Sequence, residues 1–252
     1  MKSLRIERQG PLAVLRLDKA RGNAIDATLV DELAAACAEL TREPALRGVL
    51  LASAHPKLFC PGLDLVSLVG YDRSGMERFM AAFSEALFAL YALEKPVIAA
   101  VSGHAVAGGC ILALAADVRL LRRGAQIGLN EVKVGVPLPW SVAVLLRNSV
   151  PPGALTRIAL LGRNFADEEA VAVGLADAVL EADGFEPACL EQLEEFVDKH
   201  PRAVAVTKRY LRAAALAEMR ARDHELRAEW LDAWFSEETR ERIQQIVAGL
   251  GR

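Results

Sequence analysis

The sequence has no long apolar run, no clustered cysteines and no excess of charge of one sign. Its apolar stretches are too short to cross a bilayer, and its first residues lack the apolar block of a signal peptide. Its four cysteines are scattered without a CxxC pair or a histidine cluster, which argues against disulfides and a metal site (Cys37, Cys60, Cys110 and Cys189). With a formal net charge of −3 there is no basic stripe for nucleic acid. We expect a cytoplasmic globular protein that binds neither nucleic acid nor membrane.

Two nucleotide-binding patterns are also missing. The GxGxxG fingerprint of dinucleotide-binding folds does not occur, and neither does the Gly-Lys-Ser/Thr of a P-loop. The glycine pair at residues 108 and 109 therefore needs another explanation.

The 252 residues, 53% of them hydrophobic, are enough for a substantial core. Strands are predicted at residues 4–8, 13–17, 48–53, 96–101 and 118–121, and helices at 27–40, 75–93 and 110–116. The alternation of strands with helices through about residue 180 indicates an α/β fold built from repeated units. Beyond Glu186 only helical periodicity remains, with helices expected at 189–200, 203–217, 220–235 and 237–250, the last capped by Ser236. We therefore expect a core of residues 1–186 followed by a helical region of residues 187–252.

The chain is organised around residues 101–117. An apolar strand leads into Gly108 and Gly109, and no polar side chain follows from Cys110 to Ala116, as in a helix buried on every side. Glycines at the mouth of such a helix allow another molecule to approach the backbone, and the unpaired amides of its first turn favour an anion. A tight strand-to-helix turn without any ligand explains this stretch equally well.

Glu131 is the first candidate for chemistry. It precedes the apolar residues Val132, Val134 and Val136, and we expect it at the end of a strand. Loss of solvation there would raise its pKa toward the range of a general base. The alternative is an ordinary solvated glutamate.

The amide of Leu63 is the second candidate. It follows Pro61-Gly62 in a loop, where an N–H free of regular pairing can be directed at a ligand. Together with the amide of Gly108 or Gly109 it would form an oxyanion hole. A surface turn fits the same residues. His104, which has no triad partner at a suitable spacing, is better explained as a buried, hydrogen-bonded histidine.

Taken together, four segments resemble the crotonase superfamily of enoyl-CoA hydratases and isomerases. They are Arg21-Gly-Asn-Ala-Ile, Leu58-Phe-Cys-Pro-Gly-Leu-Asp-Leu, Gly103-His-Ala-Val-Ala-Gly-Gly-Cys and Ile127-Gly-Leu-Asn-Glu. The resemblance covers about residues 4–200 and extends more loosely into the helical tail.

The resemblance implies a spiral of β-β-α units whose helical tail builds trimers, often paired into hexamers. It implies an acyl-CoA thioester as substrate, coenzyme A being part of that substrate, and no separate cofactor. The thioester oxygen would accept from the amides of Leu63 and Gly108, and Glu131 would be the catalytic acid/base. The substrate would contact residues near these three (Ala24, Ile25, Cys60, Gly62, Asp64, Leu65, Val66, Gly109, Ile111 and Val134).

One departure from the family pattern selects the reaction. Hydratases of this family carry a glutamate two positions after the Gly-Gly pair, where this sequence has Ile111. Adding water requires activation of that water and delivery of a proton to carbon-2, work that the hydratases share between two carboxylates. Moving a double bond from the 3,4 to the 2,3 position needs one base, which takes the proton from carbon-2 and returns it to carbon-4. The pattern resembles the Δ3,Δ2-enoyl-CoA isomerases, so we expect an isomerase.

Two further departures concern the pocket. Pro61 stands where the family has a small residue, which would stiffen the first oxyanion loop, and Trp140 follows a Pro-Leu-Pro segment. Trp140 would either cap the acyl pocket or pack beneath the loop. The alternatives to an isomerase are a hydratase or another acyl-CoA hydrolase or lyase of the superfamily, and an inactive CoA-binding homologue that serves as an assembly partner.

Overall fold

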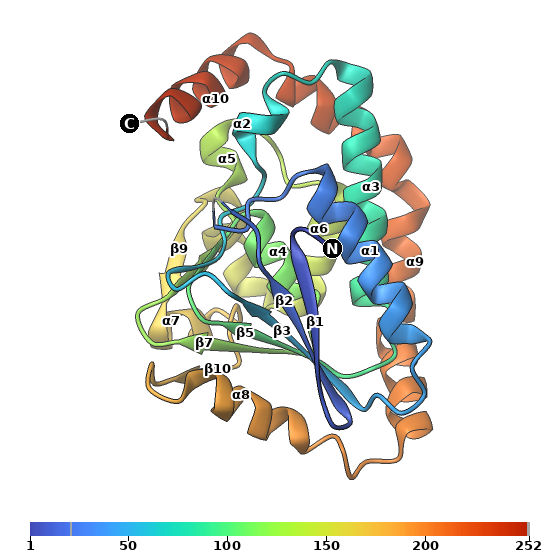
Figure 1. Cartoon of the computed structure of the whole chain (residues 1–252). Helices are drawn as coiled ribbons and strands as arrows, with labels where there is room; N and C mark the ends of the chain where they lie inside the picture. Colours follow the sequence, from blue (N-terminus) through green and yellow to red (C-terminus); the bar gives the residue numbers. More distant parts are fainter. Residues whose placement is uncertain (21, 251–252) are drawn as a thin grey trace.

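The computed structural model describes residues 1–20 and 22–250 (Figure 1). Two strands followed by one or two helices recur four times. The first unit comprises β1 (Leu4–Gln9), β2 (Leu12–Leu17) and α1 (Ala27–Thr41), and the second β3 (Gly48–Ser53), β4 (Leu58–Cys60), α2 (Leu65–Leu68) and α3 (Arg73–Tyr91). The third comprises β5 (Val97–Val101), β6 (His104–Val106) and α4 (Gly108–Leu114), and the fourth β7 (Val118–Arg122), β8 (Gln126–Gly128), α5 (Glu131–Val134) and α6 (Trp140–Ser149). The expected spiral of β-β-α units is confirmed.

The rest of the chain is mainly helical. A 3₁₀ turn (Pro152–Ala154) and a π-helical turn (Thr156–Leu160) lead to β9 (Asn164–Ala166), α7 (Asp167–Ala172) and β10 (Ala178–Leu180). The helices α8 (Phe185–Glu194), α9 (Pro201–Trp234) and α10 (Glu237–Leu250) follow.

The strands form two sheets. The larger has the order β1-β2-β3-β5-β7-β10, in which only β1 and β2 pair antiparallel. The smaller has the order β4-β6-β8-β9, with β9 antiparallel to β8. From the second unit onward, the first strand of each unit joins the larger sheet and the second joins the smaller one. Successive units therefore stack side by side.

The larger sheet is covered on both faces. Its strands β3 and β5 are buried at every residue, as their continuous apolar sequences predict. One face packs against α8 through Phe185, Cys189 and Leu193, while the opposite face joins the main core with α1, α3 and α4. Figure 1 shows α8 on one side of this sheet and these three helices on the other.

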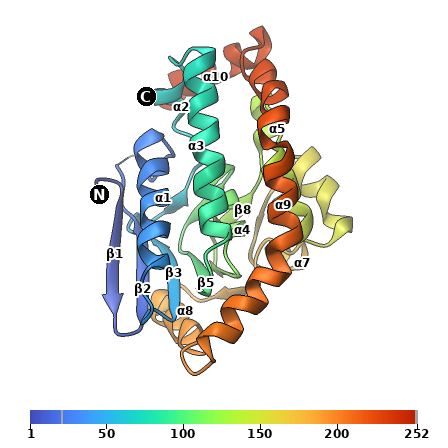
Figure 2. The same cartoon turned by 90° about the vertical axis from the view of Figure 1, so that its right-hand side faces the viewer.

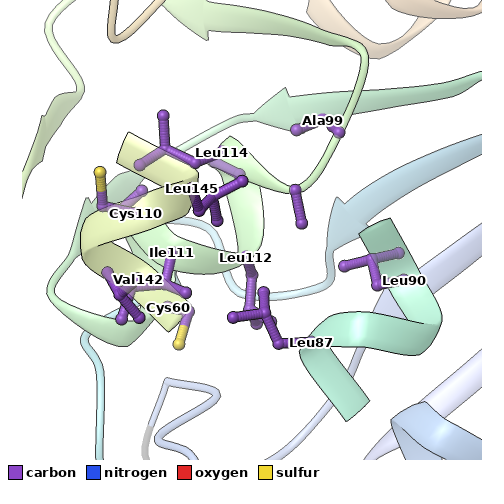
Figure 3. Close-up of a cluster of buried hydrophobic side chains, with 14 of the residues drawn as sticks. Cys60, Leu87, Leu90, Ala99, Cys110, Ile111, Leu112, Leu114, Val142 and Leu145 are labelled. Atoms are coloured by element: carbon purple, nitrogen blue, oxygen red, sulfur yellow. The ribbon is translucent and has the colours of Figure 1, made fainter. Parts of the chain in front are cut away.

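Helix α4 lies at the centre of the core, and each of its residues is buried, as predicted. Figure 3 shows its side chains surrounded by residues of α3, β4, β5 and α6 (Cys110, Ile111, Leu112 and Leu114 on α4, with Leu87, Leu90, Cys60, Ala99, Val142 and Leu145 around them). Because α4 is packed on every side, it can hold the amides of its first turn in a fixed position.

The helices after residue 184 begin and end at other residues than the sequence predicted. The predicted break between residues 217 and 220 is wrong, because α9 is one helix of 34 residues, with neither glycine nor proline after its first residue (Figure 2). The first helix begins at Phe185 and ends at Glu194, before the predicted 200. Ser236 does cap α10, since its hydroxyl accepts from the Thr239 amide at 3.4 Å. The division of the chain at residues 186 and 187 stays a prediction.

A buried charge cluster attaches α9 to the core. Lys208 Nζ lies 2.6 Å from an oxygen of Asp117, and Arg212 lies 2.7 Å from the other oxygen. Arg212 also donates to the carbonyls of Tyr91 and Ala115, at the ends of α3 and α4. Within residues 1–20 and 22–250, no helix combines the length and the apolar character that a membrane span requires.

Candidate active site

Residues far apart in the sequence enclose one cavity of about 220 Å³. Loop and helix residues from the second, third and fourth units form one part of its wall (Pro61, Leu63, Leu65, Ala107, Gly108, Ile111, Asn130, Glu131, Val134, Val136 and Pro139). Helices α3, α9 and α10 supply the remainder (Met80, Phe83, Trp230, Trp234 and Ile246). The cavity therefore brings together Glu131, Leu63, Gly108, Ile111, Leu65 and Val134 from the predicted site.

Glu131 is buried in the cavity wall, with 9% of its surface exposed. Burial raises its pKa to about 7, although a hydrogen bond from its own amide opposes the shift. Its Oε2 atom has no hydrogen-bond partner among the described residues. The pKa of this carboxyl group is thus close to that of an effective general base at neutral pH, and one of its oxygens has no hydrogen-bond partner among the described residues.

The local structure that holds Glu131 is a short helix, so the expectation that it ends a strand is wrong. Strand β8 stops at Gly128, and Glu131 is the first residue of α5. Gly135 closes this helix with a φ of 102°, and its amide donates to the Glu131 carbonyl at 3.1 Å. Thr239 of α10 donates to the Gly135 carbonyl at 3.0 Å, which fixes the end of α5.

The amide of Leu63 is free. The Ile25 amide donates to the Gly62 carbonyl at 2.8 Å, and the Asp64 amide donates to the Ile25 carbonyl at 2.9 Å. This is one rung of a parallel bridge between Ile25 and Leu63. In such a rung the N–H of the central residue is directed away from its partner strand, and Leu63 N–H donates to none of the described residues. A φ of 100° at Gly62 makes the turn before it.

Helix α4 meets this loop at contact distance. A Cβ added to Gly109 would lie 2.0 Å from the Cys60 carbonyl oxygen, and one added to Gly108 would lie 3.2 Å from Gly62 Cα. Only glycine allows this approach. Ala107, before the helix, has a φ of 49°, a strained value for a residue with a side chain. The first-turn amide of Gly108 and the free amide of Leu63 therefore belong to two segments in direct contact.

Asn23 connects the first loop to β3 and β4 by hydrogen bonds. It is fully buried with a φ of 69°, and its amide group donates to Ser53 Oγ at 2.8 Å and to the Phe59 carbonyl at 3.0 Å. The Cys60 thiol donates to the Asn23 carbonyl at 3.2 Å. These contacts explain the asparagine of the first motif, while Arg21 lies outside the described residues.

The other residues predicted to contact the substrate do not line the cavity (Ala24, Ile25, Cys60, Gly62, Asp64, Val66 and Gly109). Ala24, Ile25, Cys60 and Asp64 are buried, and Val66 on α2 is 39% exposed. Lys19 ties the segments together by donating to the Ala24 carbonyl at 2.7 Å and to Asp64 at 3.3 Å. Burial alone would raise the pKa of Asp64, but hydrogen bonds from Ser67 and Lys19 hold it below its usual value.

Ile111 stands where, by the resemblance given above, a hydratase would be expected to carry a second glutamate. It lies on the first turns of α4, is almost fully buried and forms part of the cavity wall. Among the described residues that line the cavity, Glu131 is the only acidic one. The site therefore offers one carboxyl group.

Sequence reasoning missed the five residues of α3, α9 and α10 that complete the cavity. Trp230 and Trp234 are one helical turn apart and stack with ring centroids 5.2 Å apart. Their spacing marks a common helix face in the sequence, but it does not show against which part of the molecule that face packs. Figure 1 shows α10 above α2 and α5, on the side of the molecule where the cavity lies.

Trp140 and His104, for which the sequence left more than one role open, lie outside the Glu131 cavity and make packing or hydrogen-bond contacts. Trp140 packs against α9, where its indole donates to the Glu218 carbonyl at 3.1 Å and Arg222 lies 5.1 Å from its ring. It lines an adjacent cavity of about 110 Å³, which shares Met80, Pro139 and Trp230 with the one that holds Glu131. Trp140 itself is not among the residues that line the Glu131 cavity. His104 is half-buried and accepts from the Gln126 amide at 3.1 Å, between β6 and β8.

A model of the enoyl-CoA hydratase/isomerase family matches residues 7–247. The chain belongs to this family, within the crotonase superfamily. It is 32% identical to the carnitinyl-CoA dehydratase of Salmonella typhi over 215 residues, which are 85% of this chain and 82% of that protein.

Solved structures share the fold of this family member. The human mitochondrial Δ3,Δ2-enoyl-CoA isomerase superposes with a TM-score of 0.94 at 24% identity, over 99% of this chain and 98% of that one. A probable enoyl-CoA hydratase of Mycobacterium tuberculosis superposes with a TM-score of 0.83 at 25% identity, over 90% of this chain and 95% of that one. The chain is thus an enzyme of the enoyl-CoA hydratase/isomerase family with a crotonase fold.

Proposed function

We propose that this enzyme is a Δ3,Δ2-enoyl-CoA isomerase in which Glu131 is the sole acid/base. The observation that carries the proposal is the single buried carboxyl group in a cavity whose other described lining residues are uncharged. The side chain that stands in place of a second acid is Ile111.

The reaction needs only these groups. The Glu131 carboxylate takes a proton from carbon-2 of a 3-enoyl-CoA, and the electron pair moves into a dienolate. The amides of Leu63 and Gly108 donate to the enolate oxygen, which is where the negative charge develops. Glu131 then returns the proton to carbon-4, so that the double bond lies between carbon-2 and carbon-3. No water is consumed and no atom is lost.

Coenzyme A would lie outside the cavity along the loops of residues 24–25 and 60–66. The buried side chains of Ile25 and Cys60 leave the main chain and the exposed Val66 to contact it. Since the substrate brings its own thioester, the proposed reaction needs no further cofactor.

The test is an assay with a 3-enoyl-CoA, in which conjugation of the new double bond with the thioester raises ultraviolet absorbance. We expect activity in the native enzyme and its loss, by at least about a thousandfold, in Glu131→Gln, because the amide cannot accept the proton. Acyl-CoA binding should survive in that variant, as the shape of the side chain is kept. Substantial isomerase activity in Glu131→Gln would contradict the single-base mechanism.

A second candidate is a hydratase or dehydratase, favoured by the likeness to carnitinyl-CoA dehydratase. Such a reaction also has to protonate or activate an oxygen at carbon-3, and the cavity supplies no second carboxyl group among its described lining residues. An assay of hydration distinguishes the hydratase from the isomerase. A 2-enoyl-CoA is the substrate, and the reaction is monitored as a fall in ultraviolet absorbance, because hydration removes the conjugation. Hydration faster than isomerisation would favour this second candidate, and binding without turnover would favour an inactive homologue.

A further inference from the structure

The cavity that holds Glu131 borders a second cavity of about 110 Å³. Three of the described residues line both cavities, and we call them the partition (Met80, Pro139 and Trp230). They come from three separate segments, namely α3, the residue before α6, and α9. The proposed reaction uses none of the three side chains, so their position between two cavities needs a separate explanation.

Two of these segments pass from one cavity to the other at their partition residue. Along α9, Leu226 lines the second cavity, Trp230 lines both, and Trp234 lines the Glu131 cavity, at intervals of one helical turn. In the loop between α5 and α6, Val136 lines the Glu131 cavity and Pro139 lines both. The two cavities therefore meet along a common wall.

Met80 is the partition residue of α3, and it is only 3% exposed. Phe83 lines the Glu131 cavity and Ser84 lines the second one. Residues three and four positions apart share a helix face, so Met80 stands where this face divides between the two cavities. Its unbranched thioether side chain fills the space there, and truncation at Cβ would open a passage through the common wall.

The walls of the two cavities differ in chemistry. Apart from Glu131 and Asn130, the described residues that line the Glu131 cavity are uncharged and apolar. In the second cavity, Asp223 accepts from Ser84 Oγ at 2.9 Å and from Arg227 at 2.5 Å. An alkyl chain is stabilised by the first wall, whereas contact with the second would take this polar network out of reach of water. The continuous apolar lining therefore ends at the partition.

We propose that the partition is the far end of the acyl pocket and that Met80 sets the length of the acyl chain that the pocket holds. This inference rests on the proposed function, because it places an acyl chain in the Glu131 cavity. Leu63 and Gly108, whose amides would hold the thioester oxygen, line that cavity and are not part of the partition. The chain then starts at these amides and stops against Met80.

Binding of saturated acyl-CoA thioesters tests the proposal without any turnover. The probes are the straight-chain thioesters from butanoyl-CoA to hexadecanoyl-CoA, and calorimetry measures their Kd. For the native enzyme we expect affinity to rise about fourfold with each methylene until the chain fills the cavity, and then to level off at a break point. A native enzyme without a break point would overturn the proposal.

Met80→Ala should move the break point to longer chains. Because the truncation removes three heavy atoms, the pocket gains room for about two methylenes, and the first even-numbered chain beyond the native break point should bind about tenfold more tightly than to the native enzyme. Met80→Val removes fewer atoms and should give a smaller gain of about fourfold, which keeps the test available if the alanine variant does not fold. An unchanged break point in the folded variants would overturn the proposal.

Leu226→Ala is the matched control. It removes apolar atoms from the second cavity, close to Trp230 on α9, but leaves the partition in place. We expect this variant to keep the native break point. A shift as large as that of Met80→Ala would mean that acyl chains already enter the second cavity in the native enzyme, and would overturn the proposal.

This proposal and the isomerase assignment fail in distinguishable ways. Saturated thioesters have no double bond, so their binding does not depend on the reaction that the enzyme catalyses. If isomerase activity is absent but the break point moves with Met80, the reaction is wrong and the end of the pocket is right. If isomerase activity is present and the break point does not move, the isomerase stands and the role of Met80 is rejected.

Discussion

Glu131 and Ile111 together determine which chemistry we propose for the site. With Ile111 where a second acid would stand, the described wall leaves one carboxyl group whose pKa burial has raised to about 7. A base with a pKa near the working pH combines a useful ionised fraction with a strong tendency to accept a proton. The same burial leads to two predictions, one on rate and one on stability.

The first prediction concerns the pH dependence of isomerisation. Because only the ionised carboxyl group of Glu131 can accept the proton from carbon-2, kcat/KM should rise about tenfold per pH unit below a pH of about 7 and level off above it. The measurement is the ultraviolet assay between pH 5 and about 9, with stability checked at each pH. A plateau that already begins near pH 5 would mean that Glu131 has an ordinary pKa.

The second prediction concerns stability. Between the ordinary glutamate pKa of 4.5 and about 7, the folded state binds a proton at Glu131 that the unfolded state releases, so this group lowers stability as pH rises. Above pH 7 the loss amounts to about 3 kcal/mol. Glu131→Gln removes it, and thermal unfolding should show a gain in Tm at pH 8 that disappears near pH 4. An equal change of Tm at both values would contradict the argument.

At the scale of elements, the site depends on the close contact between the start of α4 and β4. A Cβ at position 109 would lie 2.0 Å from the Cys60 carbonyl oxygen, so Gly109→Ala has to push the two segments apart. We expect kcat to fall at least about a hundredfold, because oxyanion donors lose their alignment with small displacements. Gly153→Ala is the control, since a Cβ there meets no atom within 4 Å. Unchanged kinetics in Gly109→Ala would show that α4 can yield.

The local sequence pattern was enough to predict those parts of the candidate site that lie within short segments of the chain. The buried character of α4, the free amide after Gly62 and the desolvation of Glu131 follow from apolar neighbours and glycines beside the residues concerned. The wall formed by Trp230, Trp234 and Ile246 was out of reach, because it depends on where α9 and α10 pack. The helical start at Glu131 was also missed, because α5 is a single turn of four residues, too short to show helical periodicity.

At the scale of the whole molecule, the alternation of strands and helices predicted repeated units and the family resemblance predicted their spiral, but periodicity misjudged the continuity of the helical tail. Periodicity alone suggested a break near residue 218, whereas the chain there has no residue that would end a helix. The continuous α9 reaches from the Asp117 cluster to the tryptophans of the cavity, so one element links the core to the cavity that holds Glu131.

The same helix leads to the last prediction, on assembly. Tyr210 and Leu211 of α9 are 72% and 79% exposed, an unusual exposure for two adjacent large apolar side chains. We expect a second copy of the chain to cover them in a homotrimer or a dimer of trimers, with a sedimentation mass three or six times that of one chain. Leu211→Asp should weaken assembly about tenfold or more, because it places a charge on the apolar surface that the second copy would cover. Arg202→Asp, which changes charge on the exposed first turn of α9, should keep the native mass, and a monomeric native enzyme would refute the expectation.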